Sequence, residues 1–268
     1  MVIQSRRNPK VRTKKCFPPV FFLSRSMGAP RFYHEPLSPG RIQLSATEGH
    51  HFIHVLRGKE GQSIELFDGR GHCAEGVVCQ IKKSDVFAEI KTVKEFFERK
   101  SNRIIIATAA AKGQRFDWTL SKCTELGVDH IVLIQYEHSV RLGKESAIDR
   151  YQQLTVAACK QCGRNILPLI TGPQKPEETI IELKRQYPQS AILYGCPESD
   201  CKAVKSLVSN SQDVIAFVGP EGGLTEGEMQ LLKKNNAFGV CIGSHILRTE
   251  TAAIVFAAIL EYLRINKS

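Results

Sequence analysis

From residue 103 onward the sequence alternates between short apolar segments and longer segments with helical periodicity. The apolar segments, which we predict to be strands, are 103–109, 130–135, 166–170, 191–194, 214–218 and 240–242. The predicted helices between and after them are 116–126, 147–162, 176–187, 200–208, 226–234 and 251–263. Continuous apolar strands that alternate with helices predict an α/β fold with a mostly parallel sheet, covered by helices on both faces.

Residues 31–98 follow a different pattern, in which short strands are separated by turn signals. The predicted strands are 41–44, 63–67, 76–81 and 86–93, with a helix at 47–56 between the first two. Strands this short at regular intervals favour a small β-barrel. The charged segment 95–102 is the predicted boundary, so we expect a barrel domain over 27–98 and an α/β domain over 99–268.

The net charge of +10 suggests a nucleic-acid partner, but the charge is unevenly distributed. Residues 1–26 contain seven basic residues and no acidic one, and the rest of the chain has 30 basic against 27 acidic residues, a net charge of +3. Local basic patches must therefore meet any polyanion. We interpret 1–26 as a disordered RNA-contacting arm, as an Arg-rich targeting peptide, or as the product of an upstream start codon with Met27 as the natural beginning.

No apolar run approaches the ~20 residues that span a bilayer, so we expect a soluble protein without a membrane partner. Nine cysteines, an odd number without a signal peptide, indicate reduced thiols and a cytoplasmic location. Cys159 and Cys162 have metal-like spacing, but they fall in a predicted helix without a second matching pair, so we interpret them as structural. His50, His51 and His54 lack an evident fourth ligand, and no metal is expected.

The predicted strand 214–218 runs directly into Gly219-Pro220-Glu221-Gly222-Gly223. Open α/β sheets bind ligands beyond the carboxyl ends of their strands. The three glycines permit unusual backbone angles and the close approach of a ligand. Thr225-Glu226-Gly227-Glu228 then matches a capping box at the start of a helix. This is more than a tight connecting turn requires, and it makes residues 219–223 a candidate ligand loop.

The candidate loop lacks the signatures of phosphate binding. The sequence has no G-x-x-x-x-G-K-[ST] and no G-x-G-x-x-G at this place. Glu221 stands where a phosphate would need an electropositive lining. We therefore expect a neutral or cationic ligand, and S-adenosylmethionine, with its positively charged sulfonium, fits that description.

A second candidate loop, 242–248, precedes a helix that is apolar almost all round. The backbone amides of this loop and the side chains of Ile246 and Leu247 are suited to hold an adenine by its edge and face. Thr249 is the predicted cap of the helix. Arg248 stands where the helix dipole disfavours a cation, which indicates a functional role, with a surface salt bridge as the alternative.

The two candidate loops belong to a set of motifs that lie in order along residues 27–268. The set consists of His51-Phe-Ile-His-Val-Leu-Arg57, Leu66-Phe-Asp-Gly-Arg70, Lys112-Gly113, Thr124-Glu-Leu-Gly127, Gln161-Cys-Gly-Arg164, Gly219-Pro-Glu-Gly-Gly223 and Ile246-Leu-Arg-Thr-Glu-Thr-Ala252. The set resembles the RsmE family of bacterial 16S rRNA (uracil-N3)-methyltransferases, in the SPOUT superfamily. The resemblance implies a PUA-like barrel, an α/β domain with a deep trefoil knot, a homodimer, and 16S rRNA or the assembled small subunit as partner.

The two loops and the resemblance together define an expected site. The expected cofactor-binding residues are Leu193, Gly195, Gly219, Pro220, Glu221, Gly222, Gly223, Ile242, Gly243, Ile246 and Leu247. In the catalytic hypothesis, Arg248 stabilises the uracil anion and Glu221 orients the base or accepts its proton. The basic residues expected to bind RNA are Arg31, Arg57, Lys112, Arg115, Lys122, Arg141 and Arg164.

Two alternatives to uracil-N3 methylation stay open at this point. A related knotted enzyme would methylate the 2′-oxygen of a ribose in RNA, although the segments 51–57 and 161–164 favour the uracil target. A non-catalytic RNA-binding factor of ribosome assembly would leave both glycine loops without a purpose. A nicotinamide oxidoreductase is disfavoured because the dinucleotide fingerprint is absent.

Overall fold

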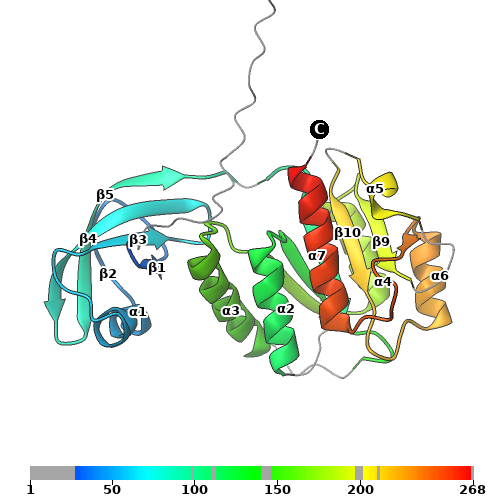
Figure 1. Cartoon of the computed structure of the whole chain (residues 1–268), viewed down its shortest axis with the longest axis horizontal. Coiled ribbons are helices and arrows are strands. Elements are labelled where there is room, and N and C mark those ends of the chain that lie inside the picture. Colours follow the sequence, from blue (N-terminus) through cyan, green and yellow to red (C-terminus); the bar gives the residue numbers. More distant parts are fainter. Residues whose placement is uncertain are drawn as a thin grey trace, which may run out of the picture.

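The computed structural model describes residues 28–97, 99–109, 113–139, 146–196, 202–209 and 212–266. The segment 1–26, Lys112 and Arg141 lie outside the described residues, and so do the roles predicted for them. The described chain forms two sheets, a small N-terminal sheet at one end and a larger sheet covered by helices (Figure 1). No helix among the described residues is long and apolar enough to cross a membrane.

The N-terminal sheet has five strands in the order β1-β3-β4-β5-β2. They are β1 (Arg31–Tyr33), β2 (Gly40–Gln43), β3 (Ser63–Phe67), β4 (His72–Lys82) and β5 (Asp85–Glu95). The helix α1 (Ala46–His50) and the π-helical turn η1 (His51–Val55) follow β2. The four predicted strands and the helix are confirmed, and β1, which the sequence analysis missed, pairs in parallel with β3. Phe32 on β1 and Phe52 on η1 meet edge to face in the core of this sheet.

The larger sheet has six parallel strands in the order β11-β9-β10-β6-β7-β8. They are β6 (Ile104–Ala109), β7 (His130–Ile134), β8 (Leu169–Gln174), β9 (Ala191–Gly195), β10 (Val214–Val218) and β11 (Phe238–Val240). The predicted parallel sheet is confirmed, but the strand expected at 166–170 begins three residues later. The reason is tertiary: Leu167 donates its backbone N–H to Gly69 O, and Ile166 bridges Arg70, so this segment pairs with the N-terminal sheet instead.

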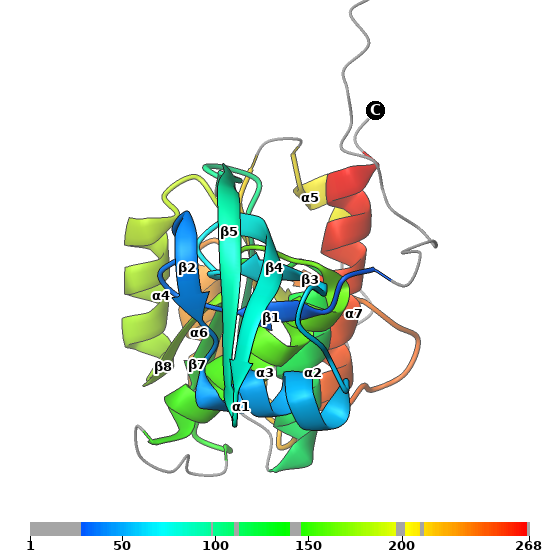
Figure 2. The same cartoon turned by 90° about the vertical axis from the view of Figure 1, so that its left-hand side faces the viewer.

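Helices cover both faces of the larger sheet (Figure 2). The helices α2 (Gln114–Glu125), α3 (Ser146–Cys162) and α7 (Thr249–Ile265) pack on one face, and α4 (Pro176–Gln186) and α6 (Glu226–Lys234) pack on the other. Alternate residues of a strand point to opposite faces. Accordingly Ile104 and Ile106 join the core beneath α2 and α7, whereas Ile105 and Ala107 join the core beneath α4 and α6. In the segment 200–208, only α5 (Val204–Leu207) is helical among the described residues.

Partly buried polar contacts join β1 and α1 of the N-terminal part to α3 and to the residues just after α3. Lys160 on α3 donates to Glu48 Oε1 at 2.8 Å and to Oε2 at 2.6 Å. The Arg31 guanidinium donates to the backbone oxygen of Arg164 at 2.8 Å and to the side chain of Asn165. Buried charged groups are stable only when they are paired or fully hydrogen-bonded, so these contacts set how the two sheets meet.

Candidate active site

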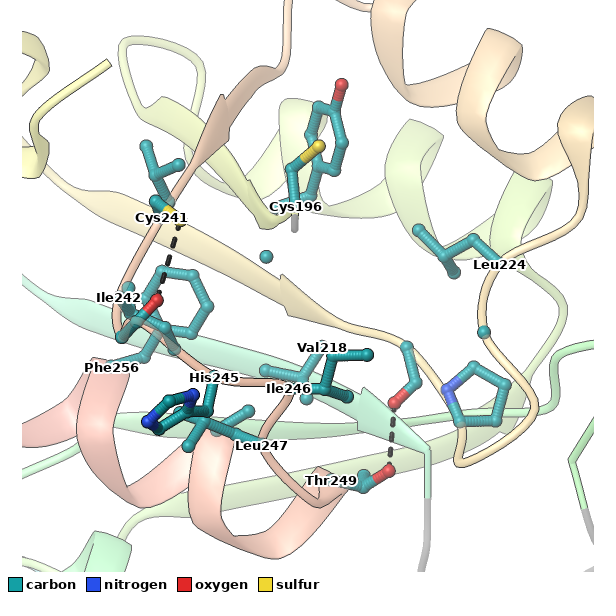
Figure 3. Close-up of a pocket in the computed structure, with 18 of the residues that line it drawn as sticks. Cys196, Val218, Leu224, Cys241, Ile242, His245, Ile246, Leu247, Thr249 and Phe256 are labelled. Carbon is teal, nitrogen blue, oxygen red and sulfur yellow. Dashed lines mark hydrogen bonds between the residues drawn. The ribbon is translucent and has the colours of Figure 1, made fainter. Parts of the chain in front are cut away.

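The carboxyl ends of β9, β10 and β11 surround a cavity of about 620 Å³ (Figure 3). Its wall consists of three loops, 194–196, 218–224 and 240–249, and Phe256 of α7 contributes to the apolar part of the lining. Small-molecule sites typically have about 300–1,000 Å³ and a mostly apolar lining with a few polar groups. This cavity lies where the sequence analysis expected a ligand site, beyond the carboxyl ends of the parallel strands.

The first wall of the cavity is the loop after β10, and two of its glycines are required by geometry. Gly223 has φ +77° and closes a turn by donating its N–H to Pro220 O at 2.9 Å. A Cβ on Gly222 would lie 2.9 Å from His138 Cβ, closer than side chains tolerate. The capping box predicted after this loop is confirmed, since Thr225 Oγ1 accepts from Glu228 N and Glu228 Oε2 accepts from Thr225 N.

The second wall, residues 241–248, has no regular secondary structure. Within the described part of the chain, no hydrogen bond is made by the backbone N–H groups of residues 242–247. Exposed donors of this kind in a cavity wall are free to bind the polar edge of a ligand. Ile246 is 91% exposed, so its apolar side chain is available to contact a ligand or a partner surface.

The two walls are connected directly. Thr249 Oγ1, on the first residue of α7, donates to Gly219 O at 3.1 Å (Figure 3). The predicted cap role of Thr249 is therefore wrong: the N-cap is Arg248, which makes no side-chain capping bond. The hydroxyl instead joins the end of the second loop to the start of the first.

Most of the expected cofactor-binding residues line the cavity, and two do not. Gly195, Gly219, Pro220, Glu221, Gly223, Ile242, Gly243, Ile246 and Leu247 lie in its wall. Leu193 is fully buried in the core beneath α7, and Gly222 is turned toward His138. Cys196, Cys241 and Met229 also lie in the wall and were not among the predicted residues. Cys196 directly follows β9, so the rule for strand ends was the signal that could have identified it.

Of the two predicted catalytic residues, Glu221 lies in the wall of the cavity and Arg248 does not. Glu221 lines the cavity, and its Oε1 lies 2.9 Å from Arg115 Nη1. Arg115 Nε lies 3.9 Å from Glu250 Oε1. Arg248 is exposed, and among the described residues its guanidinium has no ion-pair partner. The surface salt bridge that the sequence left as an alternative for Arg248 is thus not observed in the described part of the chain.

The structure does not gather the remaining predicted RNA-binding residues into one patch. Arg57 is exposed at the end of η1, and Lys122 on α2 is paired with Glu125 at 2.8 Å. Arg31 and Arg164 are directed inward: Arg31 is ion-paired with Glu65, and Arg164 donates to the backbone oxygens of residues 124 and 128. Guanidinium groups used in this way are not presented to an RNA surface.

Comparisons with known proteins agree with this geometry. Residues 98–261 match the family model of the RNA methyltransferase domain, and residues 44–91 match that of the RNA methyltransferase PUA domain. Two curated relatives, both called ribosomal RNA small subunit methyltransferase E, come from Rickettsia conorii and Buchnera aphidicola. They are 29% and 26% identical, over 83% and 87% of this chain and 90% and 92% of their own lengths.

Solved structures give the same result. The ribosomal RNA small subunit methyltransferase E of Neisseria gonorrhoeae, bound to S-adenosylmethionine, is 30% identical, with a TM-score of 0.77 over 88% of this chain and 98% of that one. A Legionella pneumophila protein in complex with the same cofactor is also 30% identical, with a TM-score of 0.78 over 87% and 97%. The expected α/β domain with a small N-terminal PUA-like domain is thereby confirmed. The chain belongs to the RNA methyltransferase family, in the RsmE group that its motifs resemble.

Proposed function

We propose that this chain transfers a methyl group from S-adenosylmethionine to N3 of a specific uridine in 16S rRNA. The observation that carries the proposal is the cavity at the ends of β9, β10 and β11, with its unpaired backbone amides and the carboxylate of Glu221 in the wall. The cavity lies in the part of the chain that matches the RNA methyltransferase domain, which supports methyl transfer to RNA as its function.

The residues present fit the cofactor. The free N–H groups of 242–247 suit the hydrogen-bonding edge of an adenine, and Ile242, Leu247 and Phe256 supply apolar surface for its face. Glu221 places a negative charge near the cavity, which favours a sulfonium and disfavours a phosphate. When bound, S-adenosylmethionine supplies an electrophilic methyl group.

The protein's own residues then have two tasks. Uracil N3 carries a weakly acidic proton that must leave before N3 becomes nucleophilic. We assign acceptance of that proton to Glu221 and stabilisation of the resulting anion to the exposed, unpaired guanidinium of Arg248. The base must reach the cavity unstacked from its neighbours.

Mass spectrometry of ribosomal RNA nucleosides tests the proposal in cells that lack the gene. We expect 3-methyluridine to be lost from 16S rRNA and to return when the wild-type gene is restored, but not with Arg248→Ala. Purified Arg248→Ala should bind the cofactor with a Kd within about twofold of wild type while turnover falls about 100-fold. If a 2′-O-methyl nucleoside disappears while 3-methyluridine is unchanged, the assignment of the target atom is wrong.

We also propose how the RNA is held. Arg57 and Arg115 are exposed or half-exposed, and Lys112, Lys122 and Arg141 complete the proposed set of phosphate-binding residues. We leave Arg31 and Arg164 out because their guanidinium groups are engaged inside the protein.

The proposed substrate is free 16S rRNA or the assembled small subunit, and a cytoplasmic location follows from the need to meet it. Residues 27–98 and 99–268 are the proposed domains, in line with the two family matches.

A homodimer completes the proposal. The resemblance implies it, and three large apolar side chains are exposed: Trp118 on α2, Ile246 in the second loop and Tyr262 on α7. Light scattering in solution should give twice the mass of one chain. A single-chain mass at the concentrations used for activity would contradict the dimer.

A further inference from the structure

Three elements meet through side-chain charges at the edge of the proposed active site. Glu221 belongs to the loop after β10, Arg115 to the first turn of α2, and Glu250 to the first turn of α7. The Arg115 guanidinium lies between the two carboxylates, 2.9 Å from Glu221 and 3.9 Å from Glu250. These three residues are separated by 106 and 29 positions in the chain, so only the fold brings them together.

Glu250 is an unusual carboxylate. Its side chain is 7% exposed, and its Oε2 atom is buried without a hydrogen-bond partner. A buried charged group that is not fully hydrogen-bonded costs stability. The first turn of α7 offsets part of this cost through the helix dipole, but it does not explain why a carboxylate is buried here.

Arg115 is unusual in the opposite way. A cation in the first turn of a helix is disfavoured by the helix dipole. Its side chain is half-exposed, and among the described residues the two carboxylates are the only ion-pair partners of its guanidinium. Glu250 therefore supplies a fixed negative charge that retains Arg115 at this edge, and Arg115 in turn retains Glu221.

The ion pair with Arg115 fixes the side chain of Glu221. This side chain is 63% exposed, and Arg115 is its only ion-pair partner among the described residues. An exposed glutamate without a partner samples several rotamers, and a catalytic group that is displaced by about 1 Å can lose on the order of 100-fold in rate. The position of Glu221 at the cavity thus depends on Arg115.

We propose that Glu250 is a positioning residue that acts through Arg115 on Glu221 in methyl transfer. The inference rests on the proposed function, in which Glu221 accepts the proton from the substrate base. It also gives Arg115 a task different from the RNA contact that its sequence position suggests. The two tasks separate kinetically, because loss of an RNA contact raises KM for the RNA, whereas loss of positioning lowers kcat.

Glu250→Gln tests the proposal, because it removes the charge and keeps the shape of the side chain. We expect kcat to fall by on the order of 10-fold, with KM for RNA and the calorimetric Kd for S-adenosylmethionine within about twofold of wild type. Glu250→Asp, which keeps the charge, should recover part of the loss. Glu261→Gln is the matched control at the other end of α7, where the carboxylate pairs with Arg264, and it should leave kcat unchanged.

The double variant decides whether Glu250 acts through Arg115. If it does, Arg115→Gln with Glu250→Gln should be no slower than Arg115→Gln alone, because the link is already broken. Multiplied losses, or full turnover of Glu250→Gln, would overturn the proposal. Should Glu250→Gln fail to fold, Arg115→Gln at its half-exposed position tests the same link, and an unchanged kcat would overturn it.

Turnover in these assays is the total transfer of labelled methyl groups to 16S rRNA, whichever atom accepts them. The identity of the methylated nucleoside is measured separately. Wild-type enzyme that methylates an atom other than uracil N3 would refute the proposed target and leave the comparison of variants intact. A rise in KM for the RNA alone, with kcat unchanged in every variant, would refute the positioning role and leave the target intact.

Discussion

At the scale of single residues, His130 on β7 is the clearest case of a side chain whose charge is controlled by burial. It is 3% exposed, and its two ring nitrogens lie 2.9 Å from Tyr187 Oη and 2.7 Å from Thr171 Oγ1. Burial lowers the pKa of His130 from 6.5 to about 4; the charge of Glu182 raises this pKa and that of Arg103 lowers it, both by less. The folded protein therefore holds this imidazole neutral at a pH where the unfolded chain protonates it.

This difference predicts a pH-dependent stability. Because the folded pKa lies below the unfolded value, the contribution of His130 is fully present above pH 6.5 and declines as the pH falls toward 4. The loss amounts to about 3 kcal/mol of unfolding free energy at most. Urea unfolding at pH 7 and pH 4.5 should show a smaller decline for His130→Gln than for wild type. Equal declines would contradict the assignment to His130.

Cys159 and Cys162 are the second residue-scale case. The pKa of the Cys162 thiol is lowered, chiefly because Cys159 donates a hydrogen bond to it, with help from the backbone and charge of Arg164 and against the effect of burial. The same hydrogen bond, together with burial, raises the pKa of Cys159. Cys162 is exposed and Cys159 is buried. The pair thus consists of one reactive and one protected thiol.

We expect Cys162 to be alkylated at neutral pH by iodoacetamide faster than the exposed Cys79, since the thiolate is the nucleophile. Replacement Cys159→Ala removes the donor and should shift the pH dependence of Cys162 alkylation to higher pH. Peptide mass spectrometry over a pH series measures both rates. An unchanged profile in Cys159→Ala would show that the hydrogen bond is not the cause.

At the scale of elements, the start of α6 determines how the first cavity wall ends. Thr225 and Glu228 exchange hydrogen bonds in a capping box, and Glu228 Oε1 also accepts the N–H of Glu137 at 3.0 Å. The cap therefore joins the loop after β10 to the segment after β7. An N-cap of this kind contributes about 1 kcal/mol to stability.

Thr225→Ala should lower the unfolding free energy by about 1 kcal/mol, whereas Thr225→Ser keeps the hydroxyl and should stay close to wild type. Chemical denaturation of the two variants measures the difference. Since Thr225 is adjacent to the cavity wall, the cofactor Kd should be recorded in parallel. Equal unfolding free energies of the Ala and Ser variants would show that the capping hydrogen bond of residue 225 does not stabilise the fold.

At the scale of the whole molecule, the partly buried pair of Lys160 and Glu48 joins α3 to the helix α1 of the N-terminal part. The side chains are 22% and 11% exposed, and both carboxylate oxygens accept from the same ammonium group. Removal of the lysine leaves a nearly buried carboxylate without its cationic partner, which is more damaging than the loss of an exposed pair.

Lys160→Met should therefore lower the unfolding free energy by about 1–3 kcal/mol. Lys184→Met on α4, where an exposed lysine bonds to Asn235, is the matched control and should change it by less than about 0.5 kcal/mol. Adding Glu48→Gln to Lys160→Met should restore part of the loss, because no buried charge is then left unpaired. Equal effects of the two lysine variants would show that the sheets are held by other contacts.

Local patterns in the sequence were sufficient for several features of this protein. The four inner strands of the parallel sheet, β6, β7, β9 and β10, follow from apolar runs, because a strand with helices on both faces must bury both of its sides. The capping box follows from residues three apart in one turn. The two cavity loops follow from the rule for strand ends, since the carboxyl ends of parallel strands lie on one edge.

Other features were decided by partners that are distant in the chain. No local pattern shows that Arg31 reaches Arg164 and Asn165 across more than 130 residues, so both arginines were expected at an RNA surface although the fold directs them inward. Leu193 was expected in the cofactor site, but the pleat of β9 turns its side chain into the core.

The two candidate loops show the same division. Sequence alone identified Gly219–Gly223 and residues 242–248 as candidate ligand loops, because glycine content, strand ends and helix starts are local properties. Tertiary structure decided that Thr249 joins them, that Arg115 holds Glu221, and that Glu250 is buried behind Arg115. The physical reason is that side-chain pairing depends on distances between separate elements, and these distances exist only after the elements have packed.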